Sequence, residues 1–155
     1  MAEVEIGIGK SGRRAYGFAD VALVPSRRTR DPEDVDLSWE IDAFTFDLPV
    51  MAAAMDGVVS PATAVKIGEL GGVGVLNLEG VWTRYDDPEP LLAEISQLPD
   101  ERATRRIQEI YAEPIKPELI GARIKELRAG GVVSCASMTP QRIPSFAQQL
   151  LDAEL

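Results

Sequence analysis

The sequence predicts an α/β fold built on a parallel sheet, and three observations support this prediction. Short apolar runs at residues 48–54, 73–78 and 132–137 are typical of strands buried on both faces of a sheet. The segments between them begin near Pro, Ser or Asp and include amphipathic stretches, which is typical of helices. The order of strand, helix, strand, helices, strand and helix indicates βαβ connections and therefore parallel strands.

The first part of the chain predicts short, irregular elements. Residues 16–24 are apolar enough for a strand or hairpin arm that ends at Pro25. Residues 26–36 are a predicted charged loop, and residues 37–46 alternate loosely enough for another short strand. The glycines of residues 7–12 fit the GxGxxG pattern of dinucleotide-binding turns, but no helical pattern follows them. We therefore interpret them as a plain turn.

One βαβ unit is the most clearly marked part of the sequence. Ser60 precedes Pro61, the arrangement of a helix N-cap followed by proline at the first helical position. A glycine pair beginning at Gly71 ends this helix, because glycine adopts the left-handed conformation at little cost. We expect the strands at residues 48–54 and 73–78, which flank this helix, to be parallel neighbours.

Helices dominate the part that follows. Three are predicted, at residues 88–97, 100–112 and 117–128. Gly130 and its neighbouring glycine end the last of them, while Thr139 and Pro140 predict a final helix whose start Pro144 can delay. Three core strands cannot close an eight-stranded barrel, which takes about 250 residues. The chain is therefore either a small open sheet or a truncated barrel.

Composition excludes several classes of function. The chain has 155 residues and a net charge of −9, which argues against binding nucleic-acid polymers. It contains no histidine, which removes Ser-His-Asp and Cys-His catalysis and nearly all transition-metal sites from this chain. Its single cysteine excludes an intrachain disulfide. With neither an apolar membrane span nor a secretory signal, a cytoplasmic protein without a membrane partner is expected.

Basic side chains gather near the N-terminus. Residues 1–30 carry three acidic side chains against six basic ones, which are Lys10, Arg13, Arg14, Arg27, Arg28 and Arg30. Such a segment is solvated or faces an interface, or else its arginines meet a nucleotide phosphate or a neighbouring subunit. A module that binds a partner through this segment is a further alternative, with only the charge asymmetry to support it.

Few side chains are candidates for chemistry. Cys135 lies inside an apolar run, so we interpret it as a small buried hydrophobe rather than a reactive thiolate. Met55 and Asp56 follow a predicted strand directly, and ligands bind at that edge of parallel α/β sheets. Their position allows either a ligand role or a structural one. Three acids near the start of a predicted helix are assigned a structural role there: Asp86, Asp87 and Glu89.

Three segments resemble the IMP dehydrogenase and GMP reductase family. Residues 20–26, DVALVPS, resemble its opening strand signature. Residues 48–56, LPVMAAAMD, resemble its first barrel strand and the loop after it, and residues 71–77, GGVGVLN, resemble its second strand. The stretches at residues 13–35 and 70–85 are most similar to a short bacterial branch of the family that lacks CBS domains.

The resemblance implies that residues 1–155 are the N-terminal portion of a single TIM (β/α)8 barrel domain without a CBS insertion. Family members oxidise IMP to XMP with NAD, usually as homotetramers aided by a monovalent cation such as potassium. The purine nucleotide binds at the carboxyl ends of the strands. By resemblance, Met55 packs beside the purine and Ala53 lies at the nucleotide.

The resemblance also leaves alternatives open. Family members often have histidine where Asn77 and Leu78 stand, so the cofactor-binding residues stay unassigned. The catalytic cysteine loop, the phosphate loop and the cation site of the family are expected beyond the last residue. We therefore assign no catalytic residue and no metal ligand within this chain, and we expect the chain alone to be inactive. A GMP reductase using NADPH, or a non-catalytic fragment or interaction domain, are the other interpretations.

Overall fold

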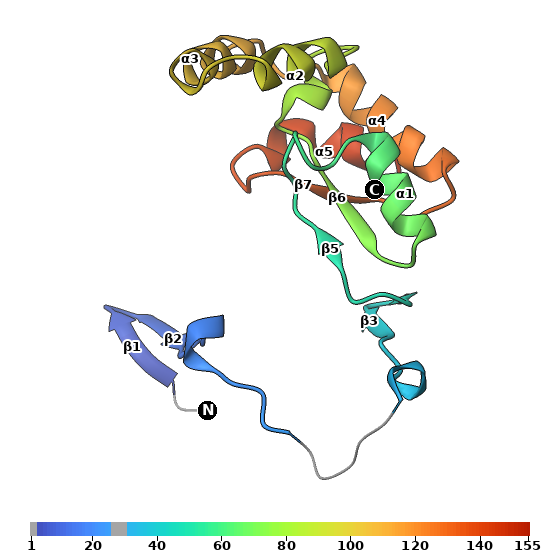
Figure 1. The fold of residues 1–155 in the computed structure, drawn as a ribbon. Helices are drawn as coiled ribbons and strands as arrows, with labels where there is room; N and C mark the ends of the chain where they lie inside the picture. The colour runs from blue at the N-terminus through green and yellow to red at the C-terminus, as the bar shows by residue number, and fades with distance from the viewer. Residues whose placement is uncertain (1–2, 26–30) are drawn as a thin grey trace. The chain divides into compact units, whose positions relative to one another are not determined.

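The structure is a computed structural model that describes residues 3–25 and 31–155 (Figure 1). The chain divides into two units, residues 1–36 and residues 37–155, and each is described by itself.

In the first unit, β1 (Glu3–Gly7) and β2 (Lys10–Arg13) form an antiparallel hairpin. Gly9 lies in its turn with a φ of 68°, a left-handed conformation that favours glycine. The interpretation of the GxGxxG pattern as a plain turn is therefore confirmed. Two short 3₁₀ helices follow, η1 (Phe18–Asp20) and η2 (Pro32–Asp34).

The predicted strand at residues 16–24 is wrong. The carboxylate of Asp20 accepts a hydrogen bond from the Gly17 N–H at 2.9 Å, which closes a 3₁₀ turn in the middle of the segment. The apolar side chains on either side of this turn stay exposed. Part of the predicted charged loop, residues 26–30, lies outside the described residues.

The second unit contains a hairpin and a parallel sheet. The hairpin consists of β3 (Trp39–Ile41) and β4 (Phe44–Phe46), two strands where the sequence predicted one. The sheet consists of β5 (Met51–Ala52), β6 (Val73–Asn77) and β7 (Cys135–Ser137) in the order β5-β6-β7. Both pairings are parallel, which confirms that the first two predicted core strands are parallel neighbours.

Helices fill the connections between these strands, and one helix follows the last strand. They are α1 (Pro61–Glu69), η3 (Val81–Thr83), α2 (Glu89–Ser96), α3 (Asp100–Tyr111), α4 (Pro117–Ala129) and α5 (Ile143–Asp152). The predicted order of strands and helices is confirmed. The Ser60 hydroxyl accepts a hydrogen bond from the Thr63 N–H at 3.0 Å, so the predicted N-cap is also confirmed. As allowed by Pro144, α5 begins only at Ile143.

Two expectations about the sheet are wrong. The strand predicted at residues 132–137 pairs only over Cys135–Ser137, and none of these three residues is buried. The sequence predicted a strand at residues 48–54 buried on both faces, but only Met51 and Ala52 pair, and the side chain of Met51 is 50% exposed. Among the described residues, β5 has a neighbouring strand on one side only. The face of the sheet that carries Met51 adjoins residues of the β3–β4 hairpin and stays partly exposed.

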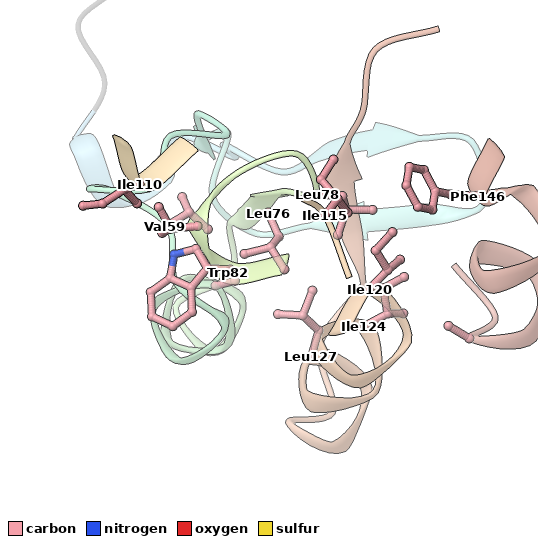
Figure 2. Close-up of a cluster of buried hydrophobic side chains, with 13 residues drawn as sticks. Val59, Leu76, Leu78, Trp82, Ile110, Ile115, Ile120, Ile124, Leu127 and Phe146 are labelled. Atoms are coloured by element: carbon pink, nitrogen blue, oxygen red, sulfur yellow. The ribbon is translucent and has the colours of Figure 1, made fainter. Parts of the chain in front are cut away.

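The core lies between the sheet and its helices. Gly74 and Leu76 of β6 face α1 and the cluster behind it, and α4 packs against both α1 and α5. Figure 2 shows the cluster, whose labelled members are Val59, Leu76, Leu78, Trp82, Ile110, Ile115, Ile120, Ile124, Leu127 and Phe146. Because Val59, Leu78 and Trp82 follow β5 and β6, the core extends under the loops at the carboxyl edge of the sheet.

Candidate functional site

The candidate site is the carboxyl edge of the parallel sheet, where three connecting segments meet. We name residues 53–60, which follow β5, the Met55 loop, and residues 78–85, which follow β6, the Trp82 loop. Residues 138–142 follow β7. Because the strands are parallel, all three segments leave the same edge.

Two carboxylates join these segments to one another. Asp56 of the Met55 loop accepts a hydrogen bond from the Val81 N–H of the Trp82 loop at 2.9 Å. Glu79 of the Trp82 loop accepts hydrogen bonds from the Thr139 N–H and, at 3.1 Å, from the Thr139 hydroxyl. The guanidinium of Arg142 lies 3.5 Å from the Glu79 carboxylate. Hydrogen bonds therefore connect the three segments that form this edge.

Met55 and Ala53 both lie on this edge with exposed side chains. The Met55 N–H donates to the Ala53 carbonyl at 2.7 Å, and the Met55 carbonyl accepts from the Val58 and Val59 N–H groups at 2.8 Å. Met55 thus sits in a compact turn with its side chain 58% exposed. An exposed apolar side chain on a hydrogen-bonded turn can contact an apolar or aromatic group of a ligand.

The side chain of Asp56, unlike that of Met55, is mostly buried and makes hydrogen bonds within the chain. It is 9% exposed, and besides Val81 its Oδ2 accepts a hydrogen bond from the hydroxyl of Tyr111 on α3. Burial, and then the contact with Asp56, raises the pKa of Tyr111, so the phenol stays protonated and donates. These contacts give Asp56 a structural role.

Gly80 and Tyr111 are partners of Asp56 that sequence reasoning missed. A Cβ at Gly80 would lie 1.8 Å from Oδ1 of Asp56, so the carboxylate sits directly against this glycine. Tyr111 lies 55 residues from Asp56 along the chain. A glycine near the end of a predicted strand was the available signal for the first partner, and no local pattern signals the second.

A hollow of about 430 Å³ lies beside the Met55 loop. Its walls include Val58 and Ser60 from this loop, Trp82, and Leu92 and Ile95 of α2. The hollow is open to solvent and mainly apolar, and the residues that line it include no basic side chain. It therefore offers surface to an apolar or aromatic group rather than to a phosphate.

Arg123 of α4 holds the Trp82 loop through hydrogen bonds to backbone carbonyls. It is 9% exposed, and its guanidinium donates to the carbonyls of Trp82 at 2.9 Å, Asp86 at 2.6 Å and Tyr85 at 3.3 Å. Arginine suits this place because its planar fork of donors reaches several acceptors at once. Sequence reasoning missed this residue.

The three acids near α2 have structural contacts, as predicted. Asp86 pairs with Lys116 at 3.0 Å, and the hydrogen bond and charge of Lys116 lower the pKa of Asp86. Asp87 accepts from the Glu89 N–H at 3.2 Å, and Glu89 lies in the first turn of α2.

Cys135 is half-buried rather than fully buried. It lines an apolar cavity of about 220 Å³ together with Met51, Val73 and residues of the β3–β4 hairpin. Burial raises the pKa of its thiol, which agrees with the interpretation of Cys135 as a structural residue.

The N-terminal basic segment is only partly described. Arg27, Arg28 and Arg30 lie outside the described residues. Arg14 lies over the ring of Tyr16, with 5.2 Å between the guanidinium carbon and the ring centroid. Residues 3–25 and 31–155 contain no cluster of three or more His, Cys, Asp or Glu side chains that could hold a metal ion. Within the same residues, no helix has the length and apolar character needed to cross a bilayer.

Comparison with known proteins decides the family. The family model described as "IMP dehydrogenase / GMP reductase domain" matches residues 15–152, which is most of the chain. The chain belongs to the IMP dehydrogenase / GMP reductase family. An archaeal family member, the inosine-5'-monophosphate dehydrogenase of Methanocaldococcus jannaschii, is 37% identical over 65 residues, which is 42% of this chain and 13% of that protein.

Other relatives match nearly the whole chain. An "uncharacterized oxidoreductase" of Mycolicibacterium smegmatis is 39% identical over 155 residues, covering 97% of this chain and 41% of that protein. A crystal structure of an IMP dehydrogenase/GMP reductase-like protein from Corynebacterium glutamicum superposes with a TM-score of 0.82 at 39% identity. The match covers 97% of this chain and 42% of that one. This chain therefore spans about two fifths of the length of these relatives.

Proposed function

We propose that the protein carrying this chain is an oxidoreductase that acts on a purine nucleotide and oxidises IMP to XMP with NAD. The observation that supports this most is the exposed Met55, held in a compact turn after β5 in a chain of this family. In this proposal residues 1–155 form the N-terminal part of a (β/α)8 barrel, and the nucleotide lies at the carboxyl edge of β5, β6 and β7.

The residues of this chain would bind and orient the substrate. The thioether of Met55 would pack against the purine, and the small side chain of Ala53 would leave room for the nucleotide beside it. In the overall reaction, IMP, NAD⁺ and water give XMP, NADH and a proton. In this proposal the covalent chemistry would belong to residues other than residues 1–155.

The cofactor and the cation rest on the family alone. The glycines of residues 7–12 form a hairpin turn instead of a dinucleotide-binding loop, and none of residues 3–25 and 31–155 is assigned to NAD or potassium. We therefore derive no step through either group. A homotetramer is likewise a proposal taken from the family resemblance, and a cytoplasmic location is a proposal taken from the sequence.

An activity assay and a comparison of two variants test the proposal. The full-length protein should form XMP and NADH from IMP and NAD, and Met55→Ala should raise KM for IMP. The matched control is Leu70→Ala, which removes another exposed apolar side chain, from the C-terminal end of α1 at the opposite edge of the sheet. This control should leave KM unchanged.

A GMP reductase is the second candidate, because the matching family model covers both activities. Consumption of NADPH with GMP, and no NADH formation with IMP, would replace the first proposal with this one. An absence of turnover with either nucleotide would leave the non-catalytic interpretation.

A further inference from the structure

The carboxylate of Asp56 holds three parts of the chain together. It belongs to the Met55 loop, it accepts from the Val81 N–H of the Trp82 loop at 2.9 Å, and it accepts from the Tyr111 hydroxyl of α3. Only the last of these contacts reaches the pair of helices formed by α2 and α3. Figure 1 shows this pair on the side of the sheet toward which β5 and β6 run.

The position of Tyr111 is fixed by contacts other than Asp56. The Tyr85 hydroxyl donates to the carbonyl of Ile110 at 3.0 Å, and the guanidinium carbon of Arg84 lies 5.5 Å from the centroid of the Tyr111 ring. Arg84 also donates to the carbonyl of Glu113, just after α3. The end of α3 is therefore fastened to the Trp82 loop, and Tyr111 offers its hydroxyl from a fixed support.

Asp56 depends on that hydroxyl. Its Oδ1 is buried against Gly80 and has no hydrogen-bond partner among the described residues, so Val81 and Tyr111 are the donors that its carboxylate has there. Without the Tyr111 hydroxyl, Oδ2 keeps only the Val81 N–H, and a mostly buried carboxylate that loses one of its two donors is held less firmly. The resulting loosening falls on the turn that presents Met55, the adjacent residue.

We propose that Tyr111 is a positioning residue for the substrate: its hydroxyl, bound to Asp56, sets the place of Met55 from the α2–α3 helical pair. The positioning of the loop follows from the contacts above. Its consequence for the nucleotide rests on the proposed function, in which Met55 contacts the purine.

The test uses Tyr111→Phe in the full-length protein, because phenylalanine keeps the ring and removes only the hydroxyl. Hydrogen exchange at the amides of Met55, Val58 and Val59 should become faster, since their turn is no longer held through Asp56. KM for the purine nucleotide should rise about three- to tenfold with little change in kcat. This rise is smaller than the full effect of losing a hydrogen bond to a charged group, because the loss reaches the nucleotide only through Met55.

Tyr85→Phe is the matched control. It removes a hydroxyl that supports the same end of α3 without contacting Asp56. Faster exchange should then appear mainly near Ile110 and be clearly smaller at Met55, Val58 and Val59, because Arg84 still holds the end of α3 and Asp56 keeps both donors. If this control loosens the Met55 loop as much as Tyr111→Phe does, general packing of α3 explains the effect and the proposal fails.

A double-mutant cycle with Asp56→Asn gives a second measure. The two substitutions should be non-additive in exchange at the Met55 loop, because they remove the same contact; additive effects would overturn the proposal. Unchanged exchange in Tyr111→Phe would overturn it too, as would faster exchange with an unchanged KM in a protein that turns over IMP or GMP. Faster exchange in a protein that uses neither nucleotide would uphold the anchoring of the loop and remove the proposed function.

Discussion

Replacing Gly74 by alanine should destabilise the protein, because β6 and α1 touch at this residue. A Cβ at this position would lie 2.6 Å from the Cα and 2.8 Å from the Cβ of Ala64. Carbon atoms pack best about 3.5–4.0 Å apart, so strand and helix would have to separate by roughly 1 Å. Overpacking of this kind costs about 1–3 kcal/mol, and we expect the upper half of that range because the nearest atom belongs to the backbone.

The matched control is Gly121→Ala, in the middle of α4. A Cβ at Gly121 meets nothing within 4 Å, and alanine favours a helix over glycine by about 0.5–1 kcal/mol. The two variants carry the same chemical change and should shift the free energy of unfolding, measured by urea denaturation, in opposite directions. A Gly74→Ala variant as stable as the unmodified protein would refute the reasoning about the contact between β6 and α1.

Two further predictions concern Arg123 of α4 and Cys135 of β7. Arg123→Lys should lower the free energy of unfolding by about 1–3 kcal/mol, because one ammonium group cannot serve the three carbonyls that the guanidinium reaches; equal stability in urea denaturation would contradict this. Cys135 should react with a thiol reagent at neutral pH more slowly in the folded than in the unfolded protein, because its raised pKa leaves less thiolate. Mass spectrometry of the peptide that contains Cys135 measures both rates, and equal rates would refute the prediction.

Local signals predicted the elements whose ends depend on neighbouring residues. The helix α1 begins at Pro61, after the Ser60 cap, and ends before Gly71, whose φ of 89° requires glycine-like freedom. The parallel pairing of β5 and β6 was also predictable, because one helix in a short connection leaves little other choice.

Burial was less predictable, because it depends on what covers an apolar segment. Residues 16–24 and 48–54 have strand-like composition, yet the first contains a 3₁₀ turn and the second pairs over two residues only. Arg123 shows the opposite case. It lies three residues after Ile120 and four before Leu127, on the apolar face of α4, so its register was a signal of burial that its charge obscured.

The sequence predicted where the candidate site lies, but it did not predict the contacts that hold the site together. A loop directly after a parallel strand marks the edge where ligands bind, which located Met55 and Asp56. The second donor to Asp56 comes from Tyr111, after the chain has passed through α1, β6, η3, α2 and α3. No periodic pattern encodes such a contact, because it depends on where α3 packs.

The methyl resonance of Met55 is the most direct test of the proposal that Met55 faces the bound purine. In the full-length protein with ¹³C-methyl methionine, the Met55 signal, assigned with Met55→Leu, should shift strongly on addition of IMP if, as proposed, the purine ring packs against it. The Met51 signal, from within β5, should move little. A Met55 signal that stays in place at IMP concentrations where calorimetry detects saturated binding would contradict the account.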